Sequence, residues 1–143
     1  MRRSHIVYAA LFIALLVGVG LAVYAITPRA AERFTEFYIL GPNGMAQDYP
    51  TQLEWGQSGT VIIGIVNREG RNARYSIAVK LDNETISTMT EIVLNNSQAW
   101  EQTFTFTPPV IGNIQVRMRL DFILYIDGAE VPYRTLRLWI TVG

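Results

Sequence analysis

NIQVRMRLDFILYID, residues 113–127, alternates apolar and polar side chains over most of its length. An apolar residue at every second position is the pattern of a β-strand with one buried face. The stretch therefore predicts one long strand whose even-numbered residues point into a core. That apolar set is Ile114, Val116, Met118, Leu120, Phe122, Leu124 and Ile126.

A second alternating stretch, RTLRLWITV at 134–142, follows after a turn signal at Asp127-Gly128. Its even-numbered residues are apolar as well, so the two stretches predict an antiparallel hairpin. A register with Phe122 opposite Leu136 keeps both apolar sets on one face.

The same register sets the outward-facing pairs of this hairpin. It places Asp121 opposite Arg137 and Arg119 opposite Trp139, which predicts one ion pair and one cation–π contact. A register two residues tighter would oppose Arg119 and Arg137, two like charges. We therefore expect the first register.

The rest of the C-terminal part continues the β pattern. Gly-, Pro- and Asn-containing turn signals separate its segments, as between the strands of a sandwich. We expect an all-β fold, an immunoglobulin-like antiparallel β-sandwich of about seven strands preceded by one transmembrane α-helix. The five further strands are predicted at 34–40, 60–67, 73–81, 90–94 and 99–107.

An uncharged run, IVYAALFIALLVGVGLAVYAI, occupies residues 6–26. As a helix it extends about 31 Å, enough to cross a hydrocarbon core of about 30 Å. The alternative is a signal peptide cleaved near Val23-Tyr24-Ala25, but the run exceeds the usual length of such a segment. The sequence therefore favours an uncleaved transmembrane helix in contact with membrane lipid.

Basic residues flank this helix almost equally, so the positive-inside rule does not decide its orientation. We expect residues 1–5 to be cytoplasmic because the C-terminal part is typical of an extracytoplasmic module. Residues 27–33 form a linker that reaches at most about 25 Å. The β-sandwich at 34–143 is then expected outside the cell, close to the membrane surface.

Small residues recur at every fourth position of the predicted helix: Ala10, Ala14, Gly18 and Ala22. Such a stripe lets two helix backbones approach closely in lipid. It predicts helix packing, either with a second copy or with other membrane or envelope subunits. Chance is the alternative, because Ala and Gly are common in membrane helices.

The composition argues against several classes of activity. Twelve basic residues balance twelve acidic ones, so no nucleic acid partner is expected. The chain has no Cys, and its single His, His5, precedes the apolar run. A Ser-His-Asp triad or a zinc site therefore lacks its residues. We predict no catalytic, cofactor-binding or metal-binding residues and no enzyme.

Two other patterns are better explained as turns. Gly41-Pro42-Asn43-Gly44 lacks the Lys and the helix of a phosphate-binding loop. Asp82-Asn83-Glu84 lacks the spacing of a calcium loop. The acidic residues are spread over many strands, which argues against a glycosidase-type carboxylate pair.

Two kinds of surface site are predicted. Arg117, Arg119, Tyr125 and Trp139 fall on the outer side of the last hairpin and form a candidate binding patch. The alternative places them under an edge strand or against the membrane. Asn83 and Asn95 each begin an Asn-X-Ser/Thr triplet at a predicted turn, so both are candidate glycosylation sites.

Two segments, FTEFYILGPNGMAQDYPTQLEWGQSGTVIIGIVNREG and LDFILYIDGAEVPYRTLRLWITV, resemble the domain of unknown function 1616 family of archaea and some bacteria. The resemblance covers nearly all of 34–143. It implies a membrane-attached extracytoplasmic β domain and supplies no catalytic residues. This chain departs from the family in having one predicted membrane helix where members commonly have several.

We therefore expect a cell-membrane protein with a single span and its N-terminus inside. The first functional hypothesis is a non-catalytic binding or assembly subunit, an accessory part of a membrane or cell-envelope complex. The second is a module that binds carbohydrate or another envelope polymer through exposed aromatic residues. An enzyme is the third and weakest, because the residues of a catalytic site are missing.

Overall fold

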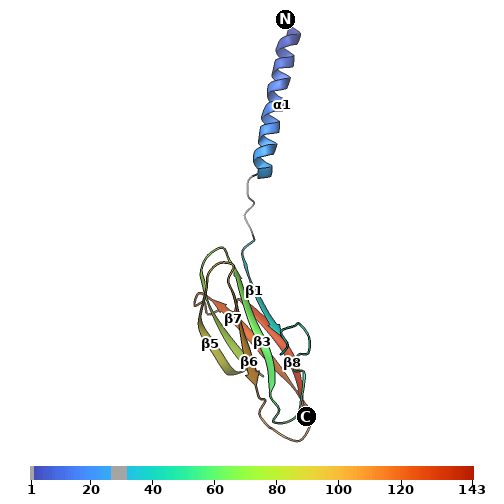
Figure 1. Ribbon diagram of the computed structural model, residues 1–143, viewed down its shortest axis with the longest axis vertical. Coiled ribbons are helices and arrows are strands. Elements are labelled where there is room, and N and C mark those ends of the chain that lie inside the picture. Colours follow the sequence, from blue (N-terminus) through green and yellow to red (C-terminus); the bar gives the residue numbers. More distant parts are fainter. Residues whose placement is uncertain (1, 27–31) are drawn as a thin grey trace. The chain divides into compact units, whose positions relative to one another are not determined.

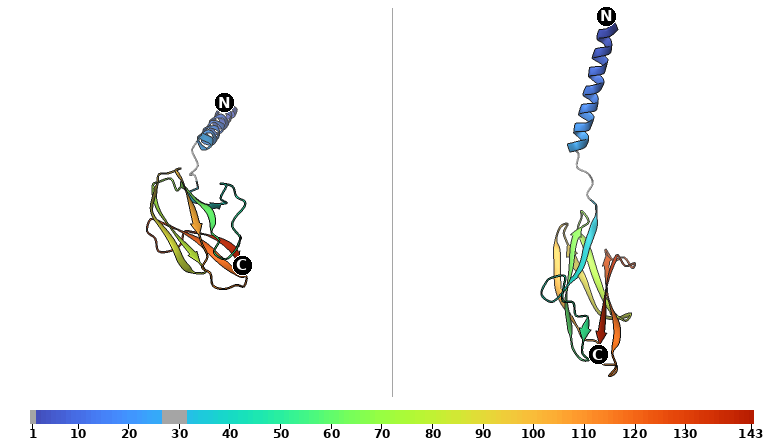
Figure 2. Two further views of the ribbon diagram at one scale, coloured as in Figure 1. Left: turned by 60° about the horizontal axis from the view of Figure 1, so that its bottom comes forward. Right: turned by 90° about the vertical axis from the view of Figure 1, so that its right-hand side faces the viewer.

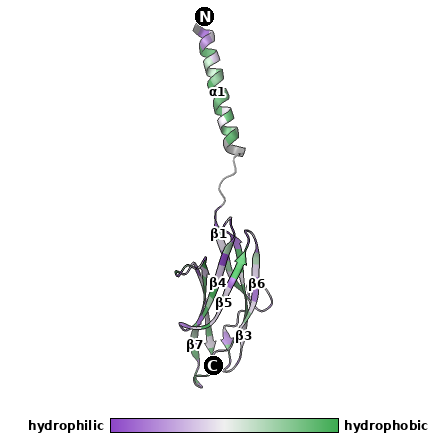
Figure 3. Cartoon of the chain, turned by 90° about the vertical axis from the view of Figure 1, so that its left-hand side faces the viewer, coloured by the Kyte–Doolittle hydropathy of each residue, from purple (hydrophilic) through white to green (hydrophobic). Residues whose placement is uncertain are grey.

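The computed structural model describes residues 2–26 and 32–143, and the chain divides into two compact units, Met1–Glu32 and Arg33–Gly143. The first unit is helix α1 (Arg2–Ile26). Its described side chains, residues 3–23, are all exposed. Figure 3 shows that most of the helix is hydrophobic, with hydrophilic residues at its start.

By length and composition, α1 is able to cross a membrane over Arg3–Val23. An N-terminal signal sequence has the same properties, so this one helix is a candidate for either. The predicted linker at 27–33 lies mostly outside the described residues.

The second unit is a sandwich of two sheets (Figures 1 and 2). The three-stranded sheet has the order β1-β3-β6, and the five-stranded sheet has the order β2-β8-β7-β4-β5. The predicted immunoglobulin-like sandwich is confirmed. Its strands are β1 (Phe34–Leu40), β2 (Gln52–Leu53), β3 (Gly59–Arg68), β4 (Ala73–Leu81), β5 (Glu84–Leu94), β6 (Ala99–Phe106), β7 (Val116–Ile126) and β8 (Arg134–Val142).

The predicted strand at 90–94 was too short. β5 starts at Glu84, directly after a tight turn in which Asp82 and Asn83 have φ angles of 47° and 69°. Two positive φ angles in a two-residue loop are typical of the turn that fits strand twist, so pairing with β4 begins at once. The first half of β5 is mostly exposed, and it therefore lacks the apolar alternation used to predict strands.

The structure differs from the sequence prediction in three smaller ways. β2 was not predicted, and it pairs in parallel with β8 over two residues, so the sandwich is not wholly antiparallel. The strand predicted at 113–127 begins only at Val116. Ile114, expected in the core, is 69% exposed because it lies in the loop before β7.

The core lies between the two sheets and contains the predicted even-numbered residues of β7. Met118, Leu120, Phe122 and Leu124 are all buried. Phe122 meets Phe104 of β6 edge to face, with 6.2 Å between ring centroids. This contact joins the five-stranded sheet to the three-stranded sheet, as expected for a sandwich core.

One end of the sandwich is closed by Asn67, the penultimate residue of β3, which is fully buried. Its amide nitrogen donates to the carbonyl oxygens of Arg71 at 2.8 Å and Leu94 at 3.0 Å. Its side-chain oxygen accepts from the backbone N–H of Glu69 at 2.9 Å. A single side chain thus joins the three-stranded sheet to the end of β5.

Beside Asn67, the buried carboxylate of Glu69 is surrounded by hydroxyl groups. Its Oε1 accepts hydrogen bonds from the hydroxyls of Thr35, at 2.9 Å, and Tyr133. The Tyr75 hydroxyl lies 2.8 Å from that of Thr35. Burial raises the pKa of both tyrosines, so their hydroxyls stay protonated and act as donors. Sequence patterns did not indicate this network, whose members come from four separate segments.

Candidate binding face

The outer face of the five-stranded sheet carries a cluster of cations around one tryptophan. Since the even-numbered residues of β7 face the core, its odd-numbered residues point outward, and the strand pairing brings partners from both neighbours beside them. We call this cluster the basic band. It consists of Lys80 on β4, Arg117 and Arg119 on β7, and Arg137 and Trp139 on β8.

Asp121 organises the centre of the basic band. In the strand register Asp121 stands opposite Lys80 of β4 and opposite Arg137 of β8. The position opposite Arg137 confirms the predicted register. The Nε of Arg137 lies 2.9 Å from Asp121 Oδ1, and the Nε of Arg119 lies 3.0 Å from Oδ2. The predicted ion pair is therefore present, and a second arginine shares the same carboxylate.

The predicted cation–π contact involves a different arginine. Arg119 does stand opposite Trp139 in the ladder, but its guanidinium turns to Asp121 and to the side-chain oxygen of Asn83. The guanidinium of Arg117, diagonally across the pair, lies over the indole ring at 4.4 Å from the centroid. A charged partner outcompetes the ring for Arg119, because an ion pair is stronger than an exposed cation–π contact.

The basic band holds a surplus of positive charge. The band holds four cations and one carboxylate; Arg119 and Arg137 form ion pairs with that carboxylate, whose side chain is 6% exposed, whereas the side chain of Arg137 is 50% exposed. The adjoining turn carries Asp82, which accepts from the backbone N–H of Arg119 at 2.8 Å. The surplus therefore lies on the side of Arg117, Arg137 and Trp139.

The predicted patch is only partly brought together. Arg117, Arg119 and Trp139 lie side by side, but Tyr125 pairs with Ser76 six residues further along β7. At about 3.3 Å per residue this is about 20 Å away from Arg119. Lys80 and Arg137 were not among the predicted patch residues, although both follow from the alternation of β4 and β8.

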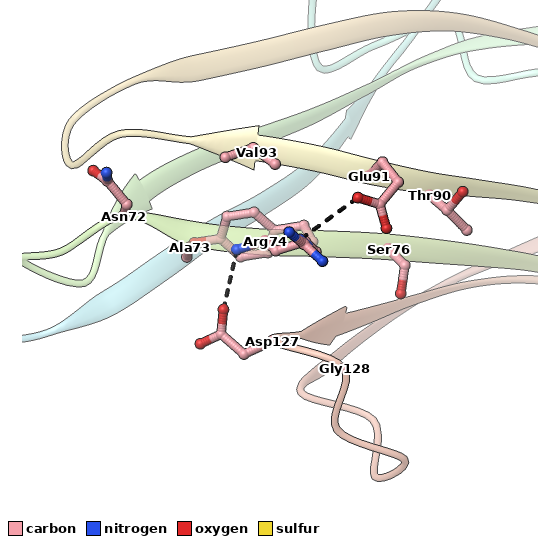
Figure 4. Close-up of a pocket in the computed structure, with 10 residues that line it drawn as sticks. Asn72, Ala73, Arg74, Ser76, Thr90, Glu91, Val93, Asp127 and Gly128 are labelled. Atoms are coloured by element: carbon pink, nitrogen blue, oxygen red, sulfur yellow. Dashed lines mark hydrogen bonds and ion pairs between the residues drawn. The ribbon is translucent and has the colours of Figure 1, made fainter.

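Tyr125 lies in the part of the sheet that borders an open hollow of about 580 Å³ (Figure 4). The hollow forms at a bulge, where Ser76 of β4 faces both Thr90 and Glu91 of β5. Glu91 takes a φ of 58° there. Bulges in an edge strand such as β5 also discourage pairing with other chains.

The charges at this hollow are paired with one another. Arg74 lies 3.6 Å from Glu91, and its backbone N–H donates to Asp127 at 3.1 Å. That hydrogen bond, followed by the Arg71 guanidinium at 2.7 Å, holds the pKa of Asp127 below its usual value. The hollow therefore offers less unpaired charge than the basic band.

The outer face of the other sheet has no cationic surplus among its described residues. Tyr38 lies across Gly64 and donates to Glu101 at 2.7 Å, and Glu36 pairs with Arg68 at 3.0 Å. Burial, followed by the hydrogen bond to Glu101, raises the pKa of Tyr38 to about 12. Positive charge is thus concentrated on one face of the sandwich.

The two candidate glycosylation sites lie in exposed turns. Asn83 stands beside the basic band, where its side-chain oxygen accepts from Arg119. Asn95 begins the β5–β6 turn, and its backbone N–H donates to Gln98 at 2.9 Å. Both asparagines are exposed, and their glycosylation stays a prediction.

The predicted helix-packing residues Ala10, Ala14, Gly18 and Ala22 are exposed on α1. Their four-residue spacing places them along one side of the helix. A Cβ built at Gly18 meets no atom within 4 Å. Contact of this stripe with another helix stays a prediction.

For metal chemistry, the described parts of the chain hold no group of three His, Cys, Asp or Glu residues able to bind an ion. The buried carboxylate of Glu69 is occupied by hydroxyl donors from the fold itself. The basic band is therefore taken as the candidate binding face.

Among solved structures, the chain is similar to a CARDB domain from Pyrococcus furiosus in complex with di-metal ions. The identity is 12% and the TM-score 0.59, covering 82% of this chain and 95% of that one. A solution NMR structure of a CARDB domain from the same organism gives 12% identity and a TM-score of 0.55, covering 78% and 97%. At such identities the likeness shows the fold alone.

A β-glucosidase from Listeria innocua in complex with glucose is 15% identical, with a TM-score of 0.54 over 80% of this chain. This chain covers only 17% of the glucosidase, so the likeness concerns one β-sandwich portion of it. No curated protein matches the chain. The family model described as a domain of unknown function, DUF1616, matches residues 28–141, and the chain therefore belongs to the DUF1616 family.

Proposed function

We propose that this protein is a non-catalytic binding or assembly subunit, anchored in the cell membrane by α1, with its β-sandwich outside the cell. The observation that carries the proposal is the exposure of the described side chains of α1 all around an apolar helix. Such a surface requires lipid or other chains to cover it. The sandwich has a core of its own and leaves its charged face available to a partner.

The proposal of a non-catalytic role rests on the available side chains. The single His belongs to α1, so no imidazole base comes from the sandwich. The orientation with the N-terminus inside is part of the proposal. A membrane helix linked by a few residues to a binding domain suits an accessory subunit of a membrane or cell-envelope complex.

Gly18→Ile tests the assembly role. Since a Cβ at Gly18 meets no atom within 4 Å, the variant is expected to keep its helix and lose only packing against another helix. We expect the mass of the purified complex in mild detergent, measured by light scattering, to fall to that of a single chain.

Gly20→Ile is the matched control. A Cβ at Gly20 also meets nothing within 4 Å, but two residues along a helix turn the side chain to nearly the opposite side. Its complex is expected to keep the original mass. An unchanged mass for Gly18→Ile, or equal losses for both variants, would contradict packing through the small-residue stripe.

A second candidate function is binding of carbohydrate or another envelope polymer. The basic band favours it, because an exposed tryptophan and several cations share one open sheet face. This role is compatible with anchoring by α1, and it gives the outer domain a ligand of its own.

A further inference from the structure

We infer that the basic band binds the carboxylate groups of an acidic polysaccharide outside the cell. This inference rests on the second candidate function and narrows its ligand from carbohydrate in general to a polyanionic polymer. It is carried by the charge, burial and spacing of the band residues.

The arginines of the band are held in place before any ligand arrives. Asp121 forms ion pairs with the Nε atoms of Arg119 and Arg137. The guanidinium of Arg117 stacks on the indole ring of Trp139. Arg137 uses Nε for the ion pair, and half of its side chain is exposed. Guanidinium groups held in this way bind carboxylates with little further loss of side-chain entropy.

The contact between Trp139 and Arg117 favours an anionic polymer over a neutral one. A neutral sugar stacks on an uncovered aromatic face, but Arg117 already covers one face of this indole at 4.4 Å. Trp139 is 44% exposed, so part of the ring still offers apolar contact. A guanidinium stacked on a ring keeps its in-plane N–H groups free for carboxylate oxygens.

The spacing of the cations favours a chain with repeated charges over a small anion. Lys80 and Arg137 stand on strands separated by β7, which places their backbones about 10 Å apart. Arg117 and Arg119 are two residues apart on β7, about 7 Å. Cations spread over three strands of an open face match a ligand that extends across the sheet.

The band lies far along the sandwich from the residue at which the chain enters it. The chain enters β1 at Phe34, which pairs with Arg68 at the end of β3. The start of β4 pairs with Ile126, at that same end of the sandwich. Arg117 lies nine residues from Ile126 along β7, about 30 Å away. The band therefore extends from the middle of β7 to the end of the domain opposite Phe34.

The test uses the full chain in detergent micelles, with polygalacturonate as the probe and dextran as the neutral polymer. We expect binding of polygalacturonate that weakens with added salt, and no binding of dextran. Lys80→Gln combined with Arg117→Gln is expected to weaken binding at least about tenfold, because two charge-assisted hydrogen bonds to carboxylates are lost.

Arg68→Gln combined with Arg74→Gln is the matched control, since it removes two exposed arginines outside the band. Its affinity is expected to stay within about twofold, as both side chains lie away from the ligand. Equal losses for the two double variants would overturn the inference, because binding would then follow total charge.

Three other results would also overturn it. These are equal binding of dextran, absence of binding to polygalacturonate, and band-dependent binding to phosphatidylglycerol vesicles without binding to polygalacturonate. The first would still support a carbohydrate-binding domain, and the last would assign the band to lipid. None of them changes the result for Gly18→Ile, so a failure here is distinct from a failure of the assembly proposal.

Discussion

Asn67→Ala is expected to lower the free energy of unfolding by about 3–6 kcal/mol, which is a large part of the stability of a domain of this size. The substitution removes two donors and one acceptor from a fully buried site. The carbonyl oxygens of Arg71 and Leu94 and the N–H of Glu69 would lose their partners, and each such group costs about 1–3 kcal/mol. Denaturant unfolding of the full chain, followed by tryptophan fluorescence, measures the change.

Two further variants make this test specific. Asn67→Asp keeps an acceptor for Glu69 but turns carboxylate oxygens toward two carbonyl groups, so it is expected to be no more stable than Asn67→Ala. Asn72→Ala changes an exposed asparagine in the following turn and is expected to stay within about 0.5 kcal/mol of the parent. A loss below about 1 kcal/mol for Asn67→Ala would show that this residue does not close the sandwich.

Gly41→Ala is expected to destabilise the domain by about 3 kcal/mol, at the upper end of the usual range for overpacking. Gly41 begins the predicted turn after β1, and its carbonyl accepts from the N–H of Gly44 at 3.0 Å. A Cβ at Gly41 would lie 1.9 Å from the carbonyl oxygen of Gln47, a main-chain atom that moves only with its loop. The same unfolding measurement applies.

Gly44→Ala separates this collision from backbone strain. Gly44 has a φ of 79° and open space around its Cβ position, so Ala there costs only about 1–2 kcal/mol for the left-handed conformation. If Gly44→Ala proved more damaging than Gly41→Ala, the backbone conformation of the turn would matter more than close packing against Gln47.

The last hairpin illustrates what the sequence was able to predict. Alternation over 113–127 and 134–142 predicted the buried faces, and opposing like charges excluded the tighter register. These are local patterns with one dominant physical cause, the burial of alternate residues. The pairing of Asp121 with Arg137 followed from them directly.

The arrangement of the basic band required three strands at once. The register predicted Trp139 as the partner of Arg119 and did not consider Asp121, two residues along the same strand. The structure shows the carboxylate taking Arg119 while Arg117 covers the ring. Tyr125 was placed in the patch because it shares a face with Arg119, but sharing a face does not bring together residues six positions apart.

The networks around Asn67 and Glu69 were also outside the reach of sequence patterns. Asn67 ends a run that was predicted as a strand, and polar residues at strand ends usually lie in solvent. The buried amide of Asn67 donates to the carbonyl oxygen of Leu94, at the far end of another strand. The carboxylate of Glu69 accepts from the hydroxyl of Tyr133, in the loop before β8. Only the folded arrangement brings these segments together.

The central claim is that α1 is an uncleaved anchor carrying the sandwich outside the cell. Mass spectrometry of peptides from alkali-washed membranes, combined with protease treatment of intact cells, tests it most directly. We expect peptides from residues 2–26 to remain in the washed membranes, and peptides from the sandwich to be lost after external protease. Release of the chain by alkali without residues 2–25, or protection of the sandwich in intact cells, would contradict the account.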